Sequence, residues 1–552
     1  MKKLLSLLFL FTSVAYSKIQ PQIYTYGEKP RLAKPDSEVA ADLMMAREEF
    51  ETFIIALPEF KSKELINKVK IIWKDKTPAV ELKTYKLFGH NFKSSSFKSG
   101  FKAGEIADIP VPLDWLIEGS ITPPTFSVLS QSQYLFEFFA TSVAQAGTYT
   151  GELTFSALKE TITIPVKLQI FDVTLPVKFE LKTTFGFAPW EVLKKHYGTW
   201  HKDERSLYDQ YYESALEHRI DLHKIYDKFP ETNAKDPLTD APPNKRSFGQ
   251  QTKPLYAGLM HKNGYQMTVT DLPVANEYKT IENEYPLTVK DIEAFWKSLN
   301  TSVVKNNYRE KTFVYYVDEP SEADLRFLGQ ELRQIKKWAP DVKFLVTSPW
   351  RQTLEGAVDI WVLNLVLWDR PNEKPPEFYR QLQTKKQELW FYVGCNSHGC
   401  TEAEDITNPD LVTDRPSAYT RVFPWMALRY GATGLLYYDT VYTYSHGGDL
   451  SPWMDSFDFT GYGEGGLFYP CTPRLGQCKT QKVIPALRLK VLRDGLEDAQ
   501  LLIMAQNKGF DLQELNKVVR HVRDFSLNTA DYEMVKRKAL TFLTKAPETK
   551  KK

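Results

Sequence analysis

The pattern of apolar residues changes near Pro176, and this change restricts the possible folds more than any other feature of the sequence. Before Pro176, short alternating runs such as 52–56 and 134–139 are separated by Pro, Gly and Ser clusters, which is typical of antiparallel strands. After it, strand-like runs alternate with helical patterns, which indicates a sheet built from βα units. The sequence therefore predicts a multidomain chain in which a β-sandwich over 18–176 precedes a βα domain.

Seven apolar runs after Pro176 are candidate strands. They are 181–187, 220–223, 311–317, 343–347, 358–365, 388–393 and 434–438. Residues 323–338, between two of these runs, carry leucine and isoleucine at helical spacing. This alternation over about 300 residues suits a (β/α)8 barrel of the TIM type with insertions, which we expect over 177–485. The polar stretch 231–251 is expected to be a loop on the active face, and a helical segment over 486–552 is expected to pack on the barrel.

The first 17 residues have the three parts of a signal peptide: a basic start at 1–3, an apolar run at 4–14 and a small-x-small site at 15–17. We expect cleavage after Ser17 and an exported protein, periplasmic or secreted. The apolar run is too short to span a bilayer, and no later stretch approaches the roughly 20 apolar residues that a span requires. Stable membrane insertion is therefore not expected; an uncleaved tether is the alternative.

The four cysteines fall into two close pairs, Cys395 with Cys400 and Cys471 with Cys478. Export permits disulfides, so two loop staples are the simplest interpretation. The segment 395–400 matches no common zinc spacing, so we predict no metal, and nothing in the sequence calls for another cofactor.

Charge and motifs exclude several classes of function. Lys and Arg number 71 against 69 Asp and Glu, a net charge of +2, so nucleic acid is not an expected partner. The chain has no Gly-rich phosphate loop, no serine-hydrolase nucleophile elbow and no His-Glu-x-x-His motif, so phosphoryl transfer and serine or zinc hydrolysis are not expected.

Two carboxylates, Asp318 and Glu319, directly follow the run 311–317. Pro320 and a helical pattern come after them. In a barrel the C-terminal end of a strand opens onto the active-site face. Neighbouring carboxylates there can address a leaving-group oxygen and an adjacent substituent, which is a useful geometry for sugar chemistry, so we predict that Asp318 and Glu319 are the catalytic pair. The structural alternative is that Pro and acidic residues are favoured where a helix begins, and the spacing alone does not decide.

Aromatic residues gather at the predicted strand ends. Sugar rings have apolar C–H faces that stack on aromatic planes, although a single aromatic residue more often packs a core. His223 is a further candidate, for which the alternative is a hydrogen-bonded core histidine. The residues that we predict to bind substrate are His223, Trp350, Asn364, Trp368, Tyr392, Tyr438 and Tyr442.

Six short motifs are spread from the first domain to the late helical segment. They are Ala46-Arg47-Glu48-Glu49-Phe50-Glu51, Tyr316-Val317-Asp318-Glu319-Pro320, Leu389-Trp390-Phe391-Tyr392-Val393, Gly434-Leu435-Leu436-Tyr437-Tyr438, 463–470 and 488–498. With them the chain resembles glycoside hydrolase family 123 and the wider group of exported bacterial proteins that share its barrel. The chain departs from that group at Tyr438, where tryptophan is expected, and at Tyr442, where the aromatic is often tryptophan. The charged run 488–498 is expected to serve helix packing and salt bridges.

The resemblance implies a retaining β-N-acetylgalactosaminidase that acts on glycans with a terminal N-acetylhexosamine by substrate assistance. Asp318 would orient the 2-acetamido group, whose carbonyl oxygen attacks the anomeric carbon, and Glu319 would be the general acid and base. No separate protein nucleophile is then needed. Two alternatives stay open. One is a glycosidase for sugars without the acetamido group, which needs another carboxylate about 5 to 5.5 Å from Glu319 for retention, and the other is a non-catalytic glycan-binding protein.

Overall fold

The computed structural model describes residues 21–24, 41–58, 60, 64–96, 104–199, 205–224, 236–240, 246–279, 281, 287–384, 386–394, 407–445, 448–449, 452–454, 456–458 and 461–545. The expected signal peptide and the pair Cys395 and Cys400 lie outside these residues. The expected domain boundaries stay predictions.

The N-terminal region consists of two sheets that enclose a common core. The five-stranded sheet has the order β1 (Gln22–Tyr24), β3 (Phe50–Leu57), β7 (Ser132–Ala140), β5 (Val80–Phe92) and β6 (Gly104–Pro112). The four-stranded sheet has the order β2 (Ala41–Arg47), β9 (Glu160–Thr174), β8 (Gly147–Ala157) and β4 (Asn67–Trp73). In β9 alternate residues, among them Ile164, Val166 and Leu168, are buried in the core because successive side chains of a strand point to opposite faces. The sheet-rich N-terminal region is confirmed, and its assignment to the sandwich folds stays a prediction.

The second region is a nearly closed barrel of seven parallel strands. Their order is β10 (Lys182–Phe185), β16 (Gly434–Tyr437), β15 (Glu388–Tyr392), β14 (Ile360–Asn364), β13 (Phe344–Val346), β12 (Thr312–Val317) and β11 (Thr270–Asp271). Six of the seven runs that we expected to be strands are strands. The strand β11 was not predicted from the sequence.

The run 220–223 forms a single β-bridge, Leu222 with Phe185, and no eighth strand is present in the described part of the chain. The reason is that side chains replace the strand ladder on the other side of this run. The carboxylate of Asp221 accepts hydrogen bonds from the backbone N–H of Thr268 (2.9 Å) and of Val269 (3.2 Å). Burial raises the pKa of Asp221 to about 7. The eight-stranded barrel therefore stays unconfirmed.

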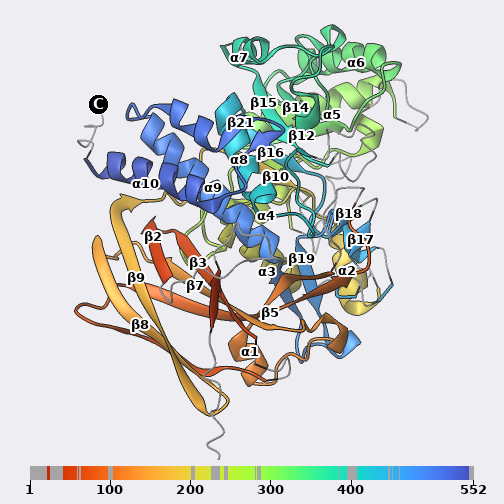
Figure 1. The fold of residues 1–552 in the computed structure, drawn as a ribbon. Helices are drawn as coiled ribbons and strands as arrows, with labels where there is room; N and C mark the ends of the chain where they lie inside the picture. Colours follow the sequence, from red (N-terminus) through yellow and green to blue (C-terminus); the bar gives the residue numbers. More distant parts are fainter. Residues whose placement is uncertain are drawn as a thin grey trace, which may run out of the picture.

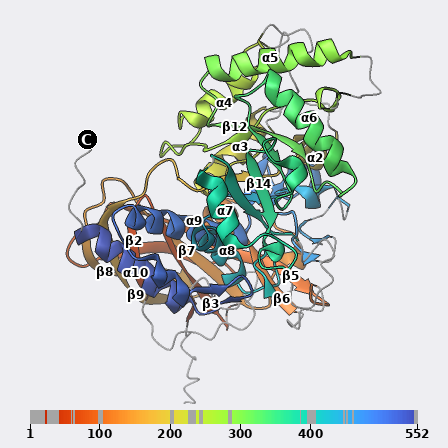
Figure 2. The same ribbon diagram turned by 90° about the horizontal axis from the view of Figure 1, so that it is seen from above.

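Helices cover the barrel and connect its strands (Figures 1 and 2). They are α2 (Pro189–Tyr197), α3 (Arg205–Glu217), α4 (Phe248–Tyr256), α5 (Val289–Lys305), α6 (Asp324–Trp338), α7 (Pro376–Thr384) and α8 (Ala418–Tyr430). The run 323–338 that we expected to be helical is α6. The stretch 231–251, expected as a loop, ends in the first turn of α4, where Ser247 and Gln250 form a capping box.

The long helix α9 (Leu487–Gln506) lies between the N-terminal sheets and the barrel, and α10 (Thr529–Lys545) packs beside it (Figure 1). Charged residues of α9 are buried and form ion pairs. Glu137 of β7 accepts from Lys490 (2.9 Å) and Arg493 (2.6 Å), and Arg488 pairs with Asp108 at 2.9 Å. The interpretation of this run as a packing and salt-bridge element is confirmed.

An ion cluster joins three barrel strands at their N-terminal ends. Glu388 of β15 pairs with Lys182 of β10 at 2.8 Å and with Lys343, which precedes β13, at 3.2 Å. Burial alone would raise the pKa of Glu388, but the two lysines lower it to about 2. This cluster therefore stabilises the barrel at the end opposite to Asp318 and Glu319.

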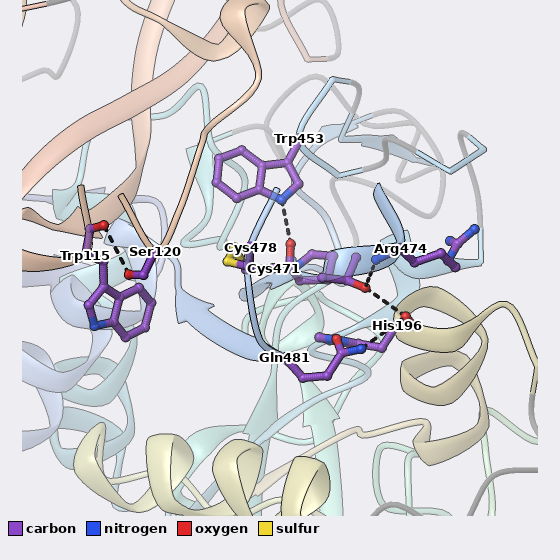
Figure 3. The surroundings of a disulfide bond; sticks show 10 residues. Trp115, Ser120, His196, Trp453, Cys471, Arg474, Cys478 and Gln481 are labelled. Atoms are coloured by element: carbon purple, nitrogen blue, oxygen red, sulfur yellow. Dashed lines mark hydrogen bonds between the residues drawn. A yellow bond between two sulfur atoms is a disulfide. The ribbon is translucent and has the colours of Figure 1, made fainter. Parts of the chain in front are cut away.

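The predicted disulfide between Cys471 and Cys478 is present (Figure 3). It joins β19 (Phe468–Cys471) to the turn before β20 (Lys482–Pro485). The indole N–H of Trp453 donates to the carbonyl of Pro470 at 2.6 Å, which ties the loop after β16 to the same place.

Among the described helices, none has the length and apolar character needed to cross a bilayer.

Candidate active site

The inner face of the barrel ends in a ring of polar and aromatic side chains. Along the strands, residues alternate between an inner cluster, which includes Leu345, Val362 and Leu436, and an outer layer packed against the helices. Continued past the last inner leucine or valine of two strands, the alternation turns Thr347 and Asn364 inward at the C-terminal edge. Three of the residues chosen from the sequence belong to this inner ring: His223, Asn364 and Tyr392.

A β-bulge in β12 sets the direction of Asp318. Tyr315 pairs with Leu345 and Val317 with Val346, so β12 carries one extra residue, Tyr316, over its partner strand. Such a bulge shifts the alternation by one position and re-aims the side chains that follow it. Tyr315 and Asp318 therefore come to lie on the same side, three residues apart.

Asp318 is exposed, and two hydroxyl groups fix one of its oxygens. Oδ1 accepts from Tyr315 Oη at 2.8 Å and from Thr347 Oγ1 at 2.7 Å. Both of these hydrogen bonds end on Oδ1. Oδ2 is therefore the oxygen available to a substrate N–H.

Glu319 is exposed as well, and its backbone has a φ of 42°, in the left-handed region that side chains other than glycine seldom adopt. Its N–H donates to Thr347 Oγ1 at 2.7 Å, and its Oε1 accepts from the hydroxyl of Tyr392. Because such strain persists only where surrounding contacts hold it, these two bonds fix Glu319. Thr347 thus contacts both residues of the pair.

Tyrosines of the inner ring are held as hydrogen-bond donors. Burial, and next the charge of Asp318, raise the pKa of Tyr315 well above 10. Burial, and next the charge of Glu319, likewise raise the pKa of Tyr392. The side chain of Asn364 forms a hydrogen bond with Tyr392 and opposes this shift. Asn364, Tyr392 and the two carboxylates therefore form one hydrogen-bonded group.

His223 contacts the same group from the other side. Its ring lies 6.0 Å from that of Tyr315, and Nδ1 hydrogen-bonds Thr184 Oγ1 at 3.0 Å. Burial, and next Lys224, lower the pKa of His223 to about 3, so the ring is neutral at ordinary pH. It is a buried, hydrogen-bonded histidine at the edge of the site.

The remaining predicted residues differ in where the structure places them. Tyr438 and Tyr442 stack edge to face, with ring centroids 5.7 Å apart, and Tyr438 packs against the outer layer. Trp350 comes three residues after Thr347, but its ring packs edge to face on Phe378 in the outer layer. Trp368 was expected beside the sugar but is 3% exposed in the outer layer.

Sequence reasoning missed Tyr315 and Thr347. Both lie on the inner face at the ends of expected strands, so strand alternation was the signal that could have found them. The described residues contain no group of three or more His, Cys, Asp or Glu side chains arranged to hold a metal ion. The site that the structure brings together is therefore a carboxylate pair with hydroxyl and amide partners.

Comparison with known proteins assigns this region. Residues 258–505 match the model described as glycoside hydrolase 123, catalytic domain, and this span includes both carboxylates. No curated protein sequence matches the chain.

One solved structure is similar over nearly the whole chain. It is a family 123 glycoside hydrolase from Clostridium perfringens, described for glycolipid glycan hydrolysis, with a TM-score of 0.62 and 12% identity over 95% of this chain and 99% of that one. A β-glucuronidase from Parabacteroides merdae (TM-score 0.26, 11% identity, 77% of this chain and 49% of that one) and β-glucuronidase 3 from Bacteroides uniformis (0.24, 10%, 88% and 51%) score too low for a common fold to follow. The chain is therefore a glycoside hydrolase that carries a family 123 catalytic domain.

Proposed function

We propose that the chain is a retaining β-N-acetylgalactosaminidase that uses the substrate's own acetamido group as nucleophile. The observation that carries this proposal is the pair Asp318 and Glu319, whose Oδ1 and Oε1 atoms are held by different partners. One carboxylate is positioned by Thr347 and Tyr315, and the other extends toward Tyr392. Two adjacent carboxylates with separate supports suit two separate tasks.

In the first step the acetamido carbonyl oxygen forms a bond to the anomeric carbon while the bond to the glycosidic oxygen breaks. Glu319 gives its proton to the departing oxygen, and Asp318 Oδ2 accepts a hydrogen bond from the acetamido N–H. This orients the carbonyl and stabilises the positive charge of the oxazolinium ion. No protein nucleophile takes part.

In the second step water attacks the anomeric carbon from the side that the leaving group vacated. Glu319 takes a proton from this water, and the bond to the carbonyl oxygen breaks, which restores the acetamido group. Two inversions at one carbon give net retention of configuration.

The substrate class also has support from outside the site. The similar Clostridium perfringens enzyme is described for hydrolysis of glycolipid glycans. We propose that the natural substrate here is a glycan with a terminal N-acetylhexosamine, and that residues 1–17 direct export of the protein to the periplasm or the cell exterior.

The experiment that tests this proposal compares three aryl glycosides: 4-nitrophenyl N-acetyl-β-D-galactosaminide, the matching glucosaminide and the matching galactoside. We expect cleavage of acetamido sugars only, and loss of about 10² to 10⁴ in rate in Asp318→Asn and Glu319→Gln. Cleavage of the galactoside at a comparable rate would contradict substrate assistance, because that sugar has no acetamido group.

A further inference from the structure

Three side chains follow neighbouring segments of the barrel mouth, and we call them the far wall: Trp190, Lys224 and Asp439. Asp439 follows β16, and three strands separate β16 from β12 in the sheet order. Trp190 follows β10, and Lys224 follows the bridged run 220–223. These three segments lie side by side and close the barrel between β11 and β15, so Asp439 lies across the mouth from β12, whereas β11 alone separates the segment of Lys224 from β12. A sugar in the mouth therefore has Asp318 and Glu319 at the end of β12 and the far wall along the arc from Lys224 to Asp439.

Backbone hydrogen bonds hold the three segments side by side. The N–H of Gly186 donates to the carbonyl of Tyr437 at 2.9 Å, and the carbonyl of Gly186 accepts from Thr440 at 2.8 Å. The N–H of His223 donates to the carbonyl of Phe185 at 2.9 Å. The far wall therefore comes from adjoining, well-anchored backbone.

Lys224 is an exposed cation on strained backbone. Its φ is 64°, and its N–H donates to Asp271 Oδ1 at 2.7 Å, which holds this conformation. Its ammonium lies 5.6 Å from the ring centroid of Trp190, a residue that is 48% exposed. An exposed indole beside an ammonium offers a sugar both an apolar plane and a hydrogen-bond donor.

Asp439 supplies an acceptor in the same wall. Its Oδ1 accepts from the N–H of Val441 at 2.7 Å, which orients the half-buried carboxylate. Burial raises the pKa of Asp439 to about 6, and the charge of Lys224 opposes this shift. The proposed mechanism assigns no task to Asp439 or to Lys224.

We propose that Lys224 and Asp439 bind hydroxyl groups of the terminal sugar at the end away from the bond that is cleaved, with Trp190 flanking that end of the ring. This inference rests on the proposed function, in which Asp318 and Glu319 engage the first two carbons. The hydroxyl groups on the remaining carbons then face the far wall. A cation and a carboxylate together match hydroxyl groups, which both donate and accept. The far wall thereby determines which sugar epimer is accepted.

The test compares wild type with Lys224→Met and Asp439→Asn, which keep side-chain size, and with Lys224→Arg, which keeps the charge. Asn at position 439 retains an oxygen for the Val441 N–H, so folding is preserved, and thermal unfolding checks this. We expect kcat/KM on 4-nitrophenyl N-acetyl-β-D-galactosaminide to fall about 10- to 100-fold, mainly through KM, in the Met and Asn variants. The arginine variant should lose less.

The matching glucosaminide differs only at the fourth carbon, so the ratio of kcat/KM for the two sugars should change at least about fivefold in one of the two variants. The proposal is overturned if both variants stay within about threefold of wild type on both sugars, if the loss lies in kcat alone, or if the ratio is unchanged in both.

A separate binding measurement distinguishes this proposal from the proposed function. If wild type cleaves no N-acetylhexosaminide, the proposed function fails, and calorimetric titration of the Glu319→Gln protein with free N-acetylgalactosamine, galactose and glucose tests the far wall by itself. A Kd that rises about tenfold on adding Lys224→Met supports it. An unchanged Kd, or no binding of any of the three sugars, overturns it.

Discussion

Replacing Thr347 by valine should weaken catalysis although Thr347 touches no substrate atom in the proposed mechanism. Its hydroxyl accepts from the N–H of Glu319 at 2.7 Å and donates to Asp318 Oδ1 at 2.7 Å, so one side chain holds both carboxylates in register. Valine has the same shape without the hydroxyl, so both bonds are lost while the packing is kept.

The size of the effect follows from the kind of bond that is lost. A hydrogen bond to a charged group contributes about 1.5 to 3 kcal/mol, and an unmade backbone bond costs about 1 to 3 kcal/mol. Because Asp318 and Glu319 are exposed, water replaces part of both, and Tyr315 still holds Asp318. We expect a net loss of about 2 kcal/mol, which corresponds to about 30-fold in kcat/KM.

The assay is steady-state hydrolysis of an aryl N-acetyl-β-D-galactosaminide by wild type, Thr347→Val and the matched control Thr347→Ser. Serine retains the hydroxyl and should stay within about threefold of wild type. The loss in valine should appear in kcat, since the carboxylates act on the transition state. Equal losses in serine and valine would attribute the effect to packing, and full activity in valine would refute the positioning role.

Three further predictions concern stability. Glu388→Gln should lower the free energy of unfolding by about 3 kcal/mol near neutral pH, because folding lowers the pKa of Glu388 from 4.5 to about 2. This stabilisation is present above pH 4.5 and is lost as the pH falls through 2, so the acid unfolding curves of variant and wild type should converge toward pH 2. Glu137→Gln removes the buried carboxylate charge that pairs with both Lys490 and Arg493 of α9 and should cost about 3 to 5 kcal/mol by denaturant unfolding, whereas an exposed Glu→Gln control such as Glu118→Gln should cost less than about 0.5. Opening the disulfide with Cys471→Ser should cost about 2 kcal/mol in the same assay, and an unchanged midpoint would show that the loop is fixed by other contacts.

The barrel could be predicted because buried parallel strands are continuous apolar runs that stand out from helical patterns. The exceptions have local causes. The strand β11 is only Thr270–Asp271, too short for any pattern, and the run 220–223 has strand composition, yet the Asp221 carboxylate takes the backbone partners that a neighbouring strand would take.

The site was predictable where it depends on the end of a strand and not where it depends on register. Asp318 and Glu319 follow an apolar strand, which the sequence shows directly. Strand alternation could have placed Tyr315 and Thr347 on the inner face, but their contacts with Asp318 depend on a bulge at Tyr316, which no pattern in the sequence reveals. Trp368 looked like a residue of the cleft, but it comes after Asn364 has ended the strand and packs outward.

In the proposed mechanism the carbonyl oxygen of the substrate is the nucleophile. The decisive measurement uses a series of aryl galactosaminides whose N-acyl group carries zero, one, two or three fluorine atoms. Fluorine withdraws electrons and weakens this oxygen as a nucleophile. If this oxygen attacks the anomeric carbon, kcat/KM should fall stepwise along the series, by several orders of magnitude in all, in a protein whose Asp318 and Glu319 are unchanged. A rate that does not change with fluorination would show that another group attacks the anomeric carbon and would rule out substrate assistance.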